Sequence, residues 1–169
     1  MTATVTLRPL ETDDLLKIRA MVEATGVFRP DEVPVALEVA RGAVEAPRED
    51  YWSIAAREDD RLLGYVTFGQ VPCTLSTWDL YWIVVDRAAH HRGIGRMLLA
   101  QCEQTVRAEG GRLLVVETSS RPEYRAARSF YEHVGYERRA TIPEYYGPGD
   151  DLVIYANYFR PSNQGTSYG

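Results

Sequence analysis

The stretch IVVDRAAHHRGIGRMLL, residues 83–99, decides the fold of this chain. It runs from an apolar strand through a short polar loop into two glycines and the start of a long helical pattern. Gly93 and Gly95 allow the backbone to approach a ligand closely, and the first turn of a helix leaves its amide hydrogens unpaired. Because such amides and the helix dipole favour anions, this stretch predicts a pyrophosphate site.

The same glycines also suit a helix in which they serve only tight packing, and the sequence leaves both interpretations open. A dinucleotide fingerprint GxGxxG is absent, and no Gly-Lys-Ser/Thr follows, so neither a Rossmann site nor a Walker loop is predicted. Three arginines, Arg87, Arg92 and Arg96, are close enough in sequence to add charge-assisted contacts to a phosphate.

Hydrophobic periodicity divides the rest of the chain into strands and helices. Alternating or continuous apolar runs predict strands over residues 4–10, 51–57, 61–71, 74–85, 112–118, 136–142 and 151–159. Helical spacing predicts helices over 12–25, 31–45, 93–110 and 123–135, and the segment 143–150 is predicted to be a loop. The order β-α-α-β-β-β-α-β-α-β-β is typical of an α/β protein with a mixed sheet rather than a doubly wound repeat.

Composition limits the class of protein. The 169 residues, 45% of them hydrophobic and 25% charged, fit a single globular domain over residues 1–160, with a flexible tail over 161–169. A net charge of −5 argues against a nucleic-acid partner, and no apolar run approaches the ~20 residues of a membrane span. No signal peptide, disulfide framework or metal-ligand spacing is recognisable, so we expect a cytoplasmic protein without a metal.

A second block strengthens the interpretation of the glycine loop. Residues 127–136, ARSFYEHVGY, follow a predicted buried strand and resemble the A-x-x-F-Y-E-K-x-G-F segment of the GNAT superfamily of acyl-CoA N-acyltransferases. Residues 90–95, HHRGIG, resemble that family's Q/R-x-x-G-x-G/A signature, with His90 at the position where Gln or Arg is usual. Tyr124 likewise stands where the family often has an asparagine.

This resemblance implies a fold and a cosubstrate. The fold is a mixed, mostly antiparallel central sheet of about seven strands with helices on both faces, in which the fourth and fifth strands splay apart. The cosubstrate is acetyl-CoA, whose pantetheine would pair with the backbone of Ile83, Val84 and Val85. Its pyrophosphate would lie on the segment formed by His90, His91, Arg92, Gly93, Ile94, Gly95 and Arg96.

Acetyl transfer to an amine makes two chemical demands. The amine must be neutral to attack, although a free alkyl amine has a pKa near ~10.4, and the departing thiolate must be protonated or stabilised. Tyr131 matches the family tyrosine near the thioester sulfur, so the resemblance makes it the candidate general acid of a direct transfer. From its position on an apolar stripe alone, Tyr131 also suits a core tyrosine.

The base and the acceptor site are less sharply defined by the sequence. Glu117 at the end of a predicted strand is the candidate base, and Asp79 on the preceding strand is the alternative, although either also suits an ion-pair partner. In the resembled family, the loops between the first two helices and between the last two strands shape the acceptor pocket. The second of these loops contributes Tyr145 and Tyr146 as predicted substrate-binding residues, and the strand 74–85 contributes Asp79 and Tyr81.

These observations predict an acetyl-CoA-dependent N-acetyltransferase. Its acceptor would be a primary amine on a small molecule or a peptide N-terminus, and the resemblance also allows a homodimer. Two alternatives remain open, a non-catalytic acyl-CoA-binding or regulatory module and the same fold using a different acyl-CoA donor.

Overall fold

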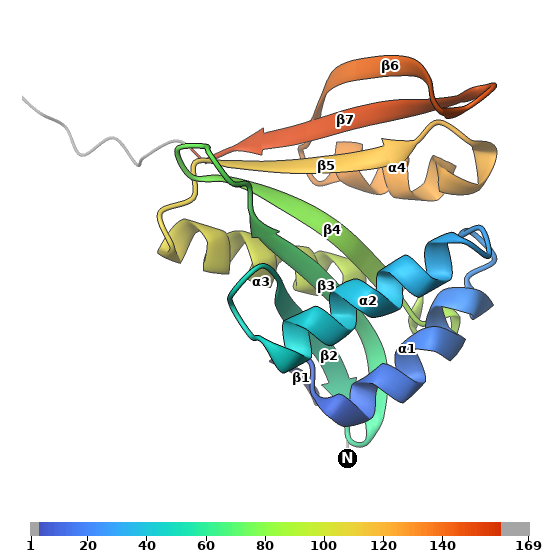
Figure 1. Ribbon diagram of the computed structural model, residues 1–169. Helices are drawn as coiled ribbons and strands as arrows, with labels where there is room; N and C mark the ends of the chain where they lie inside the picture. The colour runs from blue at the N-terminus through green and yellow to red at the C-terminus, as the bar shows by residue number, and fades with distance from the viewer. Residues whose placement is uncertain (1–3, 160–169) are drawn as a thin grey trace, which may run out of the picture.

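The computed structural model describes residues 4–159, so the tail predicted over 161–169 lies outside the described residues. The elements follow one another in the predicted order (Figure 1). The strands are β1 (Val5–Arg8), β2 (Trp52–Glu58), β3 (Arg61–Gln70), β4 (Thr77–Val85), β5 (Leu113–Ser119), β6 (Glu137–Gly147) and β7 (Asp150–Tyr158). The helices are α1 (Thr12–Ala24), α2 (Glu32–Glu45), α3 (Ile94–Ala108) and α4 (Arg125–His133).

The strands form one sheet in the spatial order β1-β2-β3-β4-β5-β7-β6. Every neighbouring pair is antiparallel except β4 and β5, which run parallel. Parallel neighbours require a crossover connection, and α3 supplies it. The mixed, mostly antiparallel seven-stranded sheet predicted from the resemblance is therefore confirmed.

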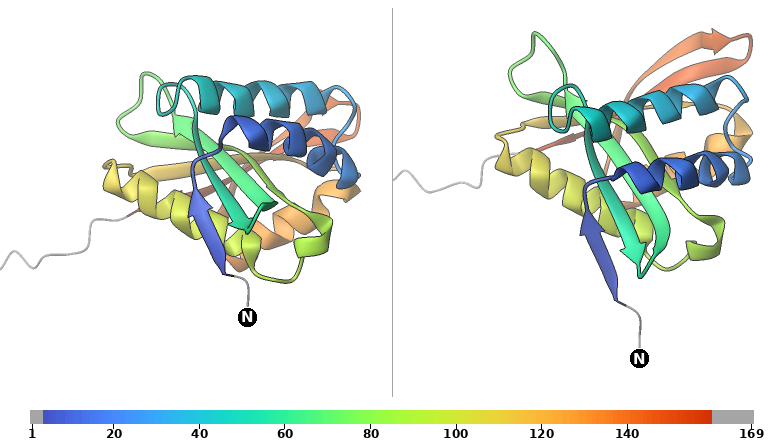
Figure 2. Two further views of the ribbon diagram at one scale, coloured as in Figure 1. Left: turned by 90° about the horizontal axis from the view of Figure 1, so that it is seen from below. Right: turned by 60° about the horizontal axis from the view of Figure 1, so that its bottom comes forward.

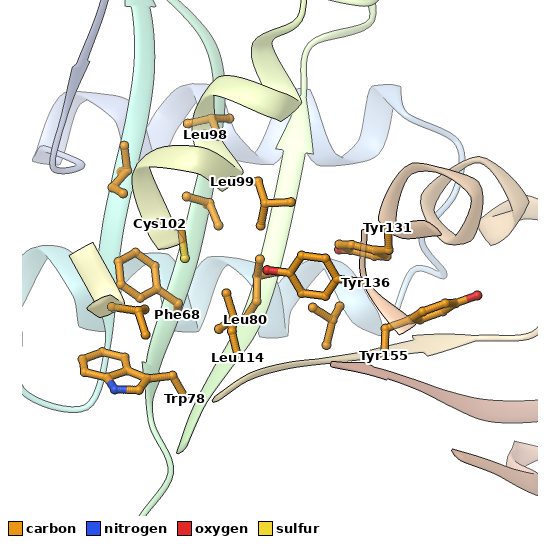
Figure 3. Packing of buried hydrophobic residues seen from close by; sticks show 14 of the residues in the cluster. Phe68, Trp78, Leu80, Leu98, Leu99, Cys102, Leu114, Tyr131, Tyr136 and Tyr155 are labelled. Atoms are coloured by element: carbon orange, nitrogen blue, oxygen red, sulfur yellow. The ribbon is translucent and has the colours of Figure 1, made fainter. Parts of the chain in front are cut away.

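Helices cover both faces of this sheet, as predicted (Figure 2). On one face α1 and α2 bury an apolar stripe that includes Ile18, Val22 and Ala36. On the other face α3 buries residues three and four positions apart, the spacing that places side chains on one side of a helix. These residues, together with aromatic side chains of the strands and of α4, form the larger core cluster (Figure 3).

The β6–β7 hairpin differs from the prediction of a loop over residues 143–150. Strand β6 extends to Gly147, and the connection to β7 is reduced to Pro148 and Gly149. The pairing shifts register between Ile142 and Gly147, because Pro143 has no amide hydrogen to give to the ladder and Glu144 has a positive φ of 52°. The segment that looks like a loop in sequence is thus a wide bulge within an extended strand.

Strands β4 and β5 are paired only at their beginnings. The parallel ladder joins residues 77–80 to residues 113–116, where Leu80 lies opposite Val116. Beyond Leu80, strand β4 remains paired with β3 as far as Val85, whereas β5 continues beside β7. The two strands therefore diverge within the sheet (Figure 1), and the backbone groups of residues 81–85 that face β5 have no strand partner. Within residues 4–159, no helix is both long enough and apolar enough to cross a membrane.

Candidate active site

The divergence of β4 and β5 opens a cavity of about 740 Å³. Its walls come from both strands, from the α1–α2 connection and the first half of α2, and from the beginning of α4. Nine of the residues predicted to form the site line this cavity: Asp79, Tyr81, Ile83, Val84, Val85, His90, Glu117, Tyr131 and Tyr146. The fold therefore brings the predicted cosubstrate, acid, base and acceptor groups to one place.

A β-bulge in β4 changes which side chains face the cavity. Thr67 of β3 pairs with Trp82 whereas Phe68 pairs with Leu80, so Tyr81 is the extra residue. Before the bulge Leu80 packs into the core on the α3 side, and after it Trp82 packs on the α1–α2 side. Because a bulge interrupts the alternation of faces, consecutive residues Tyr81 and Trp82 both contribute to the same wall.

Asp79 and Glu117 present carboxylates to the cavity from adjacent strands. Asp79 is paired in register with Val115, and Glu117 lies two residues further along β5, hence on the same face. Neither carboxylate forms an ion pair or a hydrogen bond with any residue between positions 4 and 159. Partial burial, and secondarily the charge of Glu117, raises the pKa of Asp79 to about 6.

Tyrosines surround this pair of carboxylates. The ring of Tyr81 packs edge-on against Tyr51, with centroids 5.5 Å apart, and burial and the nearby charge of Asp79 raise its pKa. Tyr146 lies near Glu117, and burial together with that charge raises its pKa to about 12. Tyr145 does not line the cavity. It is 57% exposed and packs against the ring of Tyr146 at 5.0 Å.

Tyr131 lies where the core meets the cavity. It is only 4% exposed, and its ring lies 5.8 Å from that of Tyr136 and 5.9 Å from that of Tyr155 (Figure 3). The hydroxyls of those two neighbours donate to Glu103 and Glu132 respectively, whereas the Tyr131 hydroxyl has no hydrogen-bond partner in the described part of the chain. Burial raises the pKa of Tyr131 well above its usual value.

The glycine loop has the predicted strand-to-helix arrangement. Gly93 precedes the first residue of α3 with a φ of 76°, a left-handed conformation that favours glycine. A Cβ on Gly95 would meet only ordinary contacts, the shortest at 3.6 Å to Phe130. Neither backbone conformation nor packing therefore requires glycine at position 95, and the missing side chain leaves the start of α3 uncovered.

Other residues of this loop are held by the protein itself. His90 makes a ring-nitrogen contact of 3.1 Å with the carbonyl oxygen of Val85, and His91 has a positive φ of 62°. The guanidinium of Arg92 contacts Glu58 of β2, which directs it away from the start of α3. The exposed side chain of Arg96 and the helix-start residue Ile94 complete the predicted phosphate segment. Of this segment only His90 lines the cavity, and the rest lies beside it.

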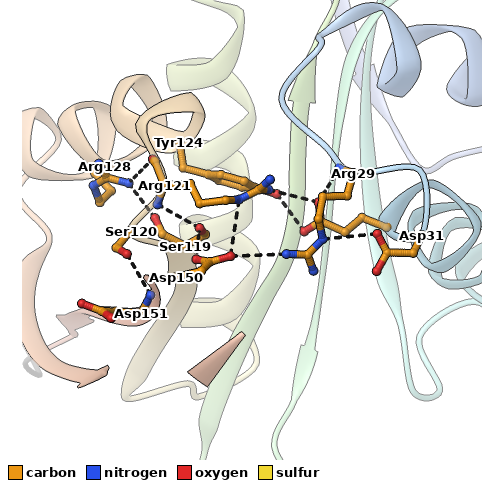
Figure 4. A network of polar contacts seen from close by, with 10 residues as sticks. Arg29, Asp31, Ser119, Ser120, Arg121, Tyr124, Arg128, Asp150 and Asp151 are labelled. Carbon is orange, nitrogen blue, oxygen red and sulfur yellow. Dashed lines mark hydrogen bonds and ion pairs between the residues drawn. The ribbon is translucent and has the colours of Figure 1, made fainter. Parts of the chain in front are cut away.

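A polar network that sequence reasoning missed lies at one end of the cavity and joins the α1–α2 connection to β5 and β7 (Figure 4). Arg29, on the α1–α2 connection, contacts Asp150 of β7 at 3.3 Å. Asp150 also accepts a hydrogen bond from Ser119 at the end of β5 and lies 3.4 Å from Arg121. Glu32 accepts hydrogen bonds from Tyr124 and from Arg121. The sequence offered one indication of this network: the loop between the first two helices and the loop between the last two strands were both expected to shape the acceptor pocket.

Comparison with known proteins identifies the family. The model of the "Acetyltransferase (GNAT) family" matches residues 18–136. A protein from Desulfovibrio desulfuricans assigned to the same family is 39% identical, covers 92% of this chain and 99% of its own, and superposes with a TM-score of 0.87. This chain therefore belongs to the GNAT acetyltransferase family and is an acetyltransferase, as the sequence resemblance predicted.

More distant structures share the fold. The ribosomal-protein-S18-alanine N-acetyltransferase from Escherichia coli is 21% identical, with a TM-score of 0.74 and coverage of 98% of this chain and all of its own. A protein from Salmonella typhimurium solved with acetyl-CoA is 17% identical, with a TM-score of 0.72 and coverage of 98% and 99%. The comparison with curated protein sequences returned no match.

Proposed function

We propose that this acetyltransferase moves an acetyl group from acetyl-CoA directly to a primary amine, with Tyr131 as the general acid. One observation carries the proposal. Within the described part of the chain, a single cavity holds a stretch of β4 without a neighbouring strand, the hydroxyl of a buried tyrosine without a hydrogen-bond partner, and two carboxylates without ion-pair or hydrogen-bond partners. These are the groups needed to hold an extended thioester, to receive a thiolate and to accept a proton from an amine.

The residues present fit acetyl-CoA. The backbone of Ile83 and the amide hydrogen of Val85 face away from β3 and can pair with the amide groups of pantetheine as a strand would. Of the other predicted groups, Val84 pairs with β3, and the Val85 carbonyl contacts His90. The first-turn amides of α3 and the bare position of Gly95 suit a pyrophosphate. Arg87 and Arg96 are exposed near this helix start, whereas Arg92 is occupied by Glu58. When bound, acetyl-CoA supplies the activated acetyl thioester.

Asp79 and Glu117 prepare the acceptor. An ammonium group entering between them is attracted by both carboxylates, and one of them takes its proton directly or through a water. With a pKa of about 6, Asp79 is mostly ionised at neutral pH and is a stronger base than an ordinary carboxylate. We therefore assign proton acceptance to this pair, with Glu117 supplying the second negative charge.

Tyr131 and the backbone at the β4 bulge act on the acetyl thioester, at its departing sulfur and its carbonyl oxygen. Because its pKa is raised, the Tyr131 hydroxyl stays protonated and is able to donate to the departing sulfur. The same apolar surroundings raise the proton affinity of a thiolate, which favours the transfer. At the bulge, the extra residue Tyr81 leaves a β4 backbone amide outside the ladder, suited to donate to the carbonyl oxygen that gains charge.

The proposal is tested by measuring release of free CoA from acetyl-CoA in the presence of pooled amines. We expect release that depends on one pool and collapses in Tyr131→Phe, while the neighbouring Tyr155→Phe retains activity. Calorimetry in parallel measures acetyl-CoA binding. Tight binding without release from any pool would instead favour the non-catalytic acyl-CoA-binding module. Release with propionyl- or succinyl-CoA in place of acetyl-CoA would identify another donor.

A further inference from the structure

Three of the five acidic side chains that line the cavity already contact arginines of the protein. Asp31 and Asp150 contact the guanidinium of Arg29 at 3.2 and 3.3 Å. Glu32 contacts Arg121 at 3.4 Å and accepts a hydrogen bond from Tyr124 at 2.9 Å. Of the cavity carboxylates in the described chain, this leaves Asp79 and Glu117 without a partner. The cavity therefore offers a positive charge one place, between these two carboxylates, although its lining is acidic overall.

The wall on the α1–α2 side of the cavity is apolar and aromatic. Phe28 packs against Trp82 with ring centroids 5.1 Å apart, and α2 adds Val35 and Val39. Val35 is 49% exposed although it lines the cavity. Exposed apolar surface inside a pocket is covered when a ligand of matching character binds. An uncharged stem would cover this wall, whereas a second charge would be desolvated against it without a partner.

A side-chain contact spans one end of the cavity and favours a small acceptor. The contact between Arg29 and Asp150 bridges the α1–α2 connection and the start of β7 across this end (Figure 4). A bulky acceptor entering at this end would have to displace this contact to reach Asp79. A small molecule fits inside without opening it.

We propose that the acceptor is a small monoamine on an uncharged, largely apolar stem, an inference that rests on the proposed amine acetylation. Its ammonium group would lie between Asp79 and Glu117, and its stem would cover Phe28, Val35 and Trp82. Polyamines and aminoglycosides, which carry several ammonium groups, are poor acceptors on this account, as are peptide N-termini.

The sharpest test compares acceptors that differ by one group. Hexylamine and hexane-1,6-diamine share a stem but differ by one positive charge, and trialanine amide supplies a peptide N-terminus. We expect kcat/KM for hexylamine to exceed the values for both others by about tenfold or more. Equal or better turnover of the diamine or the peptide overturns the inference while leaving amine acetylation intact. Failure of every amine, with acetyl-CoA bound, removes the proposed function and the inference together.

A variant provides an independent test in the same enzyme. Val35→Asp places a carboxylate on the apolar wall, at an exposed position in the first turns of α2 where an acidic side chain suits the helix dipole. We expect the preference for hexylamine over the diamine to fall by up to about fivefold, the value of a partly exposed ion pair. Leu75→Asp, at a residue 83% exposed and away from the cavity, adds the same charge as a control. An unchanged preference in Val35→Asp contradicts the inference.

Discussion

Arg29 and Asp150 lie 121 residues apart in the sequence, yet their side chains meet at 3.3 Å at the mouth of the cavity. The contact joins the connection between α1 and α2 to the beginning of β7, the two segments expected to shape the acceptor site. The two partners are held differently. Arg29 is 35% exposed in its side chain, whereas that of Asp150 is 9% exposed and is also bound to Ser119 and Arg121.

This difference predicts unequal consequences of removing the two partners. Arg29→Ala breaks a partly exposed ion pair and should lower the free energy of unfolding by less than about 1 kcal/mol. Asp150→Ala leaves the buried Ser119 hydroxyl without its acceptor and removes one of the two ion-pair partners of Arg121, so it should cost about 2 kcal/mol. Urea unfolding measures both values. Equal losses would mean that the buried contacts of Asp150 add nothing beyond the surface pair.

Replacing Tyr131 separates chemistry from binding. Tyr131→Phe removes only the hydroxyl from a ring that remains packed, so we expect kcat to fall by at least about 100-fold, as for the loss of a general acid. The Kd for acetyl-CoA should change little. Tyr155→Phe is the matched control, because its hydroxyl donates to Glu132 at 2.7 Å and does not face the cavity. Unchanged turnover in Tyr131→Phe would assign that tyrosine to packing alone.

Gly95 offers a comparison between stability and affinity. Gly95→Ala meets no close contact and should stabilise α3 by up to about 1 kcal/mol. The same methyl group should weaken acetyl-CoA binding, because it covers the proposed pyrophosphate position. Gly95→Glu adds negative charge there and should abolish measurable binding. Thermal unfolding and calorimetry on the three proteins test this, and an unchanged Kd in Gly95→Glu would refute the assigned phosphate segment.

The raised pKa of Asp79 predicts two pH effects. Because protonated Asp79 cannot accept a proton, kcat/KM should fall as the pH drops through about 6, and Asp79→Asn should remove this limb along with most activity. In the folded state Asp79 holds its proton more tightly than in the unfolded state. Its contribution to stability is therefore fully present below its unfolded pKa and is lost as pH rises through about 6.

Asp79→Asn should accordingly raise Tm relative to the wild type at pH 8, where the native carboxylate is charged and partly buried. At pH 4 the two proteins should unfold at similar temperatures, because most of the Asp79 carboxyls in the folded wild type are then neutral. Glu117→Gln is a useful companion, since removing its charge should lower the pKa of Asp79 and move the activity limb to lower pH. An activity limb that does not move would indicate that the carboxylates are not coupled.

The element order was predictable from sequence because it rests on local signals, whereas the position of the cavity followed from the family resemblance. Gly93 and Gly95 mark the start of α3, and the apolar periodicity of its following residues predicts the buried face that the structure contains. Helix α2 begins within one residue of the predicted Asp31. The second matched block placed Tyr131 on a helix, and burial between Tyr136 and Tyr155 then followed from packing.

Features that depend on distant contacts were not predictable. Arg29 and Arg121 carry no sequence signal beyond their charge, because their partner Asp150 is brought to them only when β7 is in place. The extension of β6 was missed because Pro143 and the Gly-Pro-Gly run read as a loop, although the bulge absorbs the proline. Tyr145 and Tyr146 are adjacent and chemically alike, and only the local path of β6 decides that Tyr146 lines the cavity.

The bulge at Tyr81 makes β4 sensitive to changes in length. Residues before it and after it alternate in opposite phase, so a deletion of one residue here would restore a regular pleat and move one half of the strand to the wrong face. Either Trp78 and Leu80 would leave the core, or Trp82 and Val84 would exchange places with Ile83 and Val85. This chain should therefore accept insertions and deletions in the exposed connection at residues 72–75 but not near Tyr81, where the length of the strand matters as much as the identity of its residues.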